Sequence, residues 1–110
     1  MEICLNEYIR TKNGKIDKVI NDNYYISEYI ECEKGIVDKE NIVNHSFNIT
    51  DLIEEGDIVN GQRVLYIEKE GLVIEMADYI FPYISIKEIK IEEILTHEQY
   101  ERNCYRLENN

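Results

Sequence analysis

The chain has 110 residues, and its 23 acidic and 12 basic side chains give a formal net charge of −11. This balance excludes the basic stripe that holds nucleic-acid phosphates, and an apolar fraction of 44% excludes a disordered acidic tail. No apolar run has the length of a membrane span or the form of a signal peptide, so we expect one cytoplasmic domain, residues 1–110, without membrane contact.

Hairpin turns divide the first half of the chain. Asn13-Gly14 separates residues 8–12 from residues 15–20, and both turn residues tolerate the positive φ angles of a type I′ turn. The expected elements that follow are a strand at 24–32, a short partner at 36–38, and a loop with one helical turn over 39–52. Thr50 or Asp51 is the expected cap of a second short turn.

The second half continues with the same kind of signal. Asn60-Gly61 predicts another hairpin, and Pro82 limits its segment to a sheet edge or a break. The expected elements are a tight turn at 54–57 and strands at 57–59, 62–68, 72–77, 79–81 and 93–95, with alternation or a bent strand pair at 84–91. Thr96 and Gln99 match a capping box, which predicts a helix over residues 96–104.

Short strands about ten residues apart, joined by hairpin turns, predict a mostly β protein. Scarcity of alanine (one residue) and abundance of tyrosine (nine) also favour strands over helices. We expect a small antiparallel sheet or a partly open SH3-like barrel with a short C-terminal helix, and an α+β fold is the alternative. No internal repeat, linker or low-complexity tract is visible.

No catalytic or cofactor motif is complete. The segment from His97 to Glu101 resembles the start of a zincin motif, H-E-x-x-H, but Glu101 replaces the second histidine, so too few zinc ligands remain. The glycines stand singly in turns, and no serine lies in a nucleophile elbow. The odd cysteine count (Cys4, Cys32 and Cys104) predicts free thiols. We therefore expect no enzymatic activity, no metal and no cofactor.

Two acidic clusters are the candidate partner-binding sites. The first contains Glu28, Glu31 and Glu33, with Tyr25 and Tyr29 on the same strand. The second contains Asp51, Glu54, Glu55 and Asp57. Such clusters present negative charge at roughly the spacing of phosphates, so they fit a basic channel built for nucleic acid. Exposed tyrosines beside them would anchor a protein partner.

Three stretches of the chain carry a resemblance to a known group of proteins. They are residues 45–64 (HSFNITDLIEEGDIVNGQRV), the C-terminal segments 93–101 and 105–107, and the opening 5–11 (LNEYIRT). Together they resemble small acidic proteins of phages and prophages in AT-rich bacteria. Anti-CRISPR proteins, which inhibit RNA-guided nucleases, come from the same loci. The resemblance implies that setting and carries over no functional residue.

These observations lead us to expect a phage-derived anti-defence inhibitor in the cytoplasm of a bacterial host cell. As an anti-CRISPR protein it would bind a basic surface of an RNA-guided nuclease through the acidic clusters, without catalysis and without contacting nucleic acid directly. A phage structural or assembly adaptor protein is the alternative. A third reading is a small enzyme that acts through paired carboxylates and a divalent ion. The sequence leaves the oligomeric state open.

Overall fold

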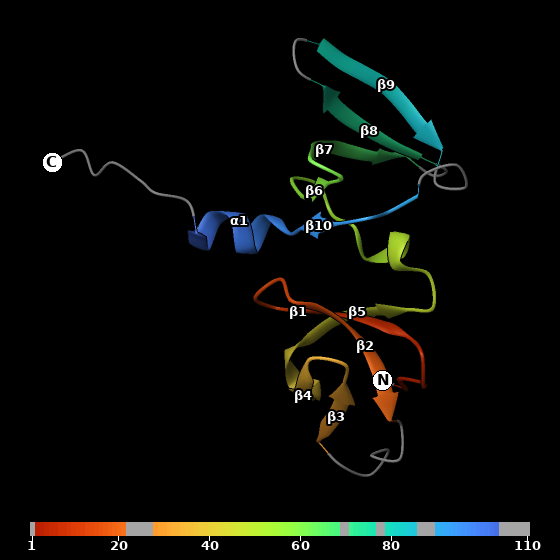
Figure 1. The fold of residues 1–110 in the computed structure, drawn as a ribbon, viewed down its shortest axis with the longest axis vertical. Helices are drawn as coiled ribbons and strands as arrows, with labels where there is room; N and C mark the ends of the chain where they lie inside the picture. Colours follow the sequence, from red (N-terminus) through yellow and green to blue (C-terminus); the bar gives the residue numbers. More distant parts are fainter. Residues whose placement is uncertain (1, 22–27, 69–70, 77–78, 86–89, 104–110) are drawn as a thin grey trace, which may run out of the picture. The chain divides into compact units, whose positions relative to one another are not determined.

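The computed structural model describes residues 2–21, 28–68, 71–76, 79–85 and 90–103 (Figure 1). The chain divides into two units, Met1–Ile53 and Glu54–Asn110, called here the N-terminal unit and the C-terminal unit. Each contains one five-stranded antiparallel sheet, and no pairing among the described residues closes either sheet into a barrel. The expected mostly β fold with a short C-terminal helix is confirmed. The expectation of a single domain stays a prediction.

The N-terminal unit is a four-strand meander whose first strand also pairs with a fifth strand. Its elements are β1 (Tyr8–Thr11), β2 (Ile16–Asn21), β3 (Tyr29–Cys32), β4 (Gly35–Asp38), η1 (Lys39–Asn41), β5 (Ile42–Ser46) and η2 (Ile49–Leu52). The strand order is β4-β3-β2-β1-β5. Six side chains, each at most 6% exposed, form its core: Ile9, Val19, Ile30, Cys32, Val37 and Ile42. The core therefore draws on every strand of the sheet.

The turn between β1 and β2 differs from the expected type I′ hairpin. Gly14 has a positive φ of 84°, but Asn13 is not among the positive-φ residues of the described chain. The N–H of Gly14 donates to the carbonyl of Thr11, and the N–H of Thr11 donates to the carbonyl of Lys15. This is a three-residue loop with glycine in the left-handed position, the next most common way to close a hairpin.

The segment 39–52 is more regular than expected. It contains β5, which pairs with β1 in the register Ile9↔His45. The second short turn, η2, is capped by Asn48, whose Oδ1 accepts the N–H of Thr50. The two expected short turns are present as η1 and η2, but the cap is Asn48 rather than Thr50 or Asp51, and residues 42–46 form a strand rather than a loop. The strand was missed because the pairing of β5 with β1 spans more than 30 residues of sequence and leaves no local pattern.

The C-terminal unit contains β6 (Ile58–Val59), β7 (Gln62–Glu68), β8 (Gly71–Met76), β9 (Tyr79–Ser85), β10 (Ile94–Leu95) and α1 (His97–Asn103). The strand order is β10-β6-β7-β8-β9. Asn60 and Gly61 have φ angles of 51° and 81°, which confirms the expected type I′ turn here. Pro82 lies within β9, the last strand of the sheet, where a missing N–H is tolerated.

Two polar side chains fix the end of this unit. Asn60 Nδ2 donates to the carbonyl of Lys90, and Asn60 Oδ1 accepts the N–H groups of Glu92 and Glu93. Thr96 Oγ1 accepts the N–H of Gln99 at 3.3 Å, so the expected threonine cap of α1 is confirmed. These bonds place β10 beside β6 and start α1 immediately after it.

The two units have the same topology. In each, four strands follow one another as an antiparallel meander, and a fifth strand pairs with the outer side of the first. A structural repeat is therefore present although the sequence shows none. None of the described helices is both long and apolar enough to cross a membrane.

Candidate partner-binding surface

The β3–β4 hairpin of the N-terminal unit presents one apolar face to the core and a mixed face to solvent. Ile30 pairs with Val37, and both are buried, at 3% and 6% exposure. Because side chains alternate across a strand, Tyr29 and Ile36 point to the other side. They are 49% and 71% exposed. Two large side chains thus lie open to solvent on one short hairpin.

Three glutamates lie along β3 and at its two ends. Glu28 and Glu33 are exposed at the two ends of β3, and Glu31 lies between them, directly opposite Ile36 in the register. Glu31 Oε2 accepts a hydrogen bond from Asn21 Nδ2 at 3.3 Å, which links it to β2. We call this set the hairpin surface. Its members are Glu28, Tyr29, Glu31, Glu33 and Ile36.

The hairpin surface contains most of the first predicted cluster. The structure places Tyr29 and the three glutamates of that cluster on it, whereas Tyr25 lies outside the described residues. Ile36 was missed by the sequence pattern. The register of the hairpin identifies it, because an inward Val37 requires an outward Ile36.

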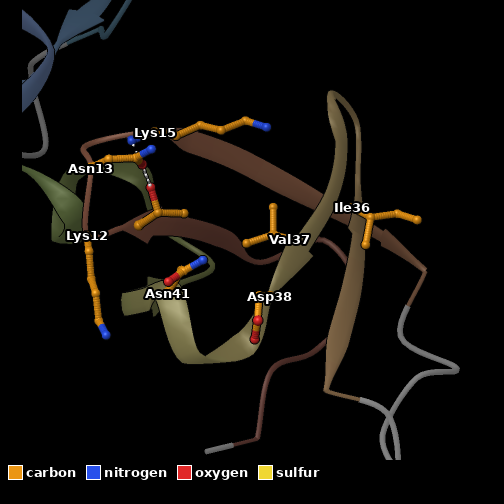
Figure 2. A pocket seen from close by; sticks show the side chains of 8 residues that line it. Lys12, Asn13, Lys15, Ile36, Val37, Asp38 and Asn41 are labelled. Atoms are coloured by element: carbon orange, nitrogen blue, oxygen red, sulfur yellow. Dashed lines mark hydrogen bonds between the residues drawn. The ribbon is translucent and has the colours of Figure 1, made fainter.

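A hollow of about 300 Å³ lies next to this hairpin (Figure 2). Lys12, Asn13 and Lys15 of the β1–β2 turn line one side, and Val37 and Asp38 line the other. Its two lysines are positively charged, whereas the chain as a whole carries a net negative charge. The negative charge of the N-terminal unit is therefore not uniform, and the hairpin surface meets the lysine-lined hollow at Ile36, which also lines the hollow.

The second predicted cluster does not form one exposed patch. Asp57 is fully buried, and its carboxylate accepts two backbone N–H groups, from Glu54 at 2.8 Å and from His97 at 2.9 Å. A carboxylate held in this way is a structural element of the turn and cannot contact a partner in the folded unit. This corrects the expectation of a surface role for Asp57.

The other three residues of that cluster have separate environments. Asp51 belongs to the N-terminal unit, where its Oδ2 accepts a hydrogen bond from the Ser46 hydroxyl. Glu54 contacts the His97 imidazole, with 2.9 Å between Oε1 and Nε2. Glu55 is exposed. Asp51 and Glu55 therefore keep the surface character that the sequence suggested, and the Glu54 side chain is 43% exposed but paired with His97.

The described thiols are free, as expected: Cys4 is half-buried and Cys32 is buried. Burial raises the pKa of the Cys32 thiol to about 11, and the nearby Asp17 carboxylate adds to this. A thiol that keeps its proton at neutral pH is a poor nucleophile. Cys32 is thus a core residue. Cys104 lies outside the described residues.

No family model, curated protein or solved structure matches this chain. What the site does is therefore argued from the geometry and charge of the described residues.

Proposed function

We propose that the chain is a non-catalytic inhibitor that docks through the hairpin surface onto a basic, nucleic-acid-binding face of another protein. The observation that carries this proposal is the exposure of Tyr29 and Ile36 on a hairpin that also carries three glutamates. Interfaces commonly combine a few apolar or aromatic anchors with a polar rim. The hairpin surface supplies both within one short element.

Charge supports a basic partner. Residues 28–38 contain four acidic side chains and one lysine, and the whole chain carries −11. Complementary charge accelerates encounter and selects the partner, while the apolar anchors slow dissociation. The channel of an RNA-guided nuclease is positively charged and open to a competitor for the nucleic-acid backbone. An anti-CRISPR role, as the phage resemblance implies, is the specific form of this proposal.

The experiment is an inhibition assay with purified RNA-guided nucleases of several types. Glu28, Glu31 and Glu33 are replaced together by glutamine, and Ile36→Asp is made separately. The matched control replaces Glu92, Glu93 and Glu101, which are exposed in the C-terminal unit, by glutamine and so removes the same charge. We expect inhibition to be lost in both hairpin variants and retained in the control.

Three results would overturn this proposal. Equal loss in the control would mean that total charge, rather than the hairpin surface, is responsible. Full inhibition by both hairpin variants would remove the surface from the mechanism. Absence of binding to every nuclease of the panel would reject the nuclease as partner.

Inhibition by the native chain should also weaken as the salt concentration rises, because the approach of the two proteins is electrostatic.

One observation favours the assembly adaptor as a second candidate. Among the described strands β4 pairs only with β3, so it is an edge of its sheet, and it carries the highly exposed Ile36. Such an edge can accept a strand from another copy. Light scattering coupled to size exclusion distinguishes the two proposals, since a ring or filament of the chain alone supports the adaptor and a monomer supports the inhibitor.

A further inference from the structure

We propose that Glu54, His97 and Glu98 of the C-terminal unit bind a divalent transition-metal ion, with Zn²⁺ as the best match. His97 Nε2 lies 2.9 Å from Glu54 Oε1 and 3.2 Å from Glu98 Oε1. One imidazole nitrogen and two carboxylate oxygens, all within 4.8 Å of one another, are donors that zinc accepts. None of the three belongs to the hairpin surface, so this inference is independent of the proposed function.

The backbone that carries two of these ligands is fixed by one buried residue. Asp57 uses its two carboxylate oxygens to accept the N–H of Glu54 and the N–H of His97. Asp57 is 0% exposed, and both bonds are partly buried. The Cα of Gly56 also lies close to the histidine, because a Cβ built there would be 3.4 Å from His97 Cβ. Glu54 and His97 are thus held together across 43 residues of sequence.

The spacing of the donors suits a small ion. Tetrahedral zinc with bonds of about 2.0–2.2 Å separates its ligand atoms by roughly 3.4 Å. The observed separations of 2.9 and 3.2 Å are slightly shorter, so small side-chain rotations suffice to admit the ion. The side chains of Glu54, His97 and Glu98 are 43%, 32% and 21% exposed. The ion therefore has an entry path, and water can complete its coordination.

Binding would place the metal where His97 carries a proton. The two carboxylates only accept hydrogen bonds when ionised, so Nε2 of His97 carries the proton that it shares with them. When the ion takes this position, the proton of a neutral imidazole moves to Nδ1, whereas an imidazolium releases it to solvent. In both cases the bound ring is neutral, and the two positive charges of the ion offset the two carboxylates. The strongly negative chain also attracts the cation.

This site differs from the incomplete zincin motif in the sequence. That motif places its ligands four residues apart on one helix, and Glu101 at the required position is exposed in α1. The structure supplies a ligand from the turn at Glu54 instead, next to β6. A search confined to the helix could not find it, because the β6–β10 pairing and the Asp57 hydrogen bonds that bring Glu54 close to His97 join distant parts of the sequence.

The test uses the full chain, kept reduced and titrated with Zn²⁺ while the imidazole protons are followed by NMR. The chain has two histidines, His45 and His97, so each site reports separately. We expect one equivalent of Zn²⁺ to shift the His97 resonances and to leave those of His45 unchanged, and EDTA to reverse the shift. Zinc bound only to a thiol would move neither imidazole, which would count against the site.

Variants identify the ligands. His97→Gln assigns the resonances, and far-UV circular dichroism checks the fold of each variant. Glu54→Gln and Glu98→Gln should each weaken Zn²⁺ binding at least about tenfold, since even second-shell changes cost that much. Glu55→Gln, an exposed neighbour, is the matched control and should bind as the native chain does. The proposal is overturned if folded Glu54→Gln and Glu98→Gln bind normally, or if millimolar Zn²⁺ moves no His97 resonance.

Discussion

Glu7 and Asp57 occupy the same position in the hydrogen-bonding frameworks of the two units. Glu7 Oε2 accepts the N–H of Cys4 at 2.7 Å, and Asp57 Oδ2 accepts the N–H of Glu54 at 2.8 Å, three residues back in each case. The two acids are 6% and 0% exposed. A buried carboxylate thus closes the turn before the first strand of each unit.

The backbone bonds around the two acids also match. Val19 N–H donates to the carbonyl of Glu7, and Val64 N–H donates to the carbonyl of Asp57. The remaining carboxylate oxygen of each acid contacts a histidine: Glu7 Oε1 lies 3.0 Å from His45 Nδ1, and Asp57 Oδ1 accepts the His97 N–H. In each unit the acid therefore connects the turn to the fifth strand or to the residues after it.

Asp57→Ala should destabilise the C-terminal unit strongly. Two partly buried backbone N–H groups would lose a charged acceptor, and hydrogen bonds to charged groups contribute about 1.5–3 kcal/mol each. We expect the free energy of unfolding to fall by about 2–4 kcal/mol, measured by urea denaturation. Glu55→Ala, which alters an exposed carboxylate, should change it by less than about 0.5 kcal/mol. Identical urea midpoints for the two variants would contradict the role given to Asp57.

The residue before each buried acid provides a direct test of the repeat. Asn6 and Gly56 both have positive φ, at 72° and 90°. Asparagine and glycine tolerate this region and alanine does not. We therefore expect Asn6→Gly to change the free energy of unfolding by less than about 0.5 kcal/mol, and Asn6→Ala and Gly56→Ala to lower it by about 1 kcal/mol, with a smaller loss for Gly56→Asn than for Gly56→Ala. Thermal or urea unfolding measures both pairs. If the alanine variants were as stable as the asparagine and glycine variants, the two positions would not be structurally equivalent.

Features set by neighbouring residues were predictable from the sequence. The hairpin at Asn60-Gly61, the threonine cap at Thr96 and the antiparallel β class all follow from turn and capping chemistry within a few positions. The β3–β4 hairpin was predicted as well, together with the acidic residues along it. Turns and helix caps can be predicted from one sequence because the residues that interact in them are a few positions apart.

Features that depend on distant partners were not predictable. Strand β5 forms through its pairing with β1, which lies more than 30 residues earlier in the sequence. The sequence alone gives Asp57 the appearance of a surface acid, because its hydrogen bond to the distant His97 is visible only in the structure. The repeat is hidden for a related reason. Cys4-Leu5-Asn6-Glu7 and Glu54-Glu55-Gly56-Asp57 share no residue, because the conserved element is a backbone geometry that different side chains satisfy.

The assignment of faces on β4 predicts that alanine substitution lowers stability clearly at one residue and hardly at its neighbour. Val37→Ala removes buried methyl groups and should lower the free energy of unfolding by about 1–2 kcal/mol. Ile36→Ala removes more atoms but from a side chain that is 71% exposed, so its effect should stay within about 0.5 kcal/mol. Urea denaturation of the two variants compares them directly. If Ile36→Ala were the more destabilising change, the register of the hairpin would be wrong, and the hairpin surface with it.

The raised pKa of Cys32 predicts both its reactivity and a pH effect on stability. Its thiol has a pKa of about 11 in the folded chain against 9.0 as the ordinary value, chiefly because of burial. The thiolate attacks alkylating reagents, so at about pH 8 the half-buried Cys4 should react well before Cys32, as peptide mass spectrometry would show. Between pH 9.0 and about 11 the unfolded chain loses this proton while the folded chain keeps it, so stability should fall with rising pH. Cys32→Ser should lose this part of the pH dependence, and equal alkylation rates for the two native thiols would contradict the burial of Cys32.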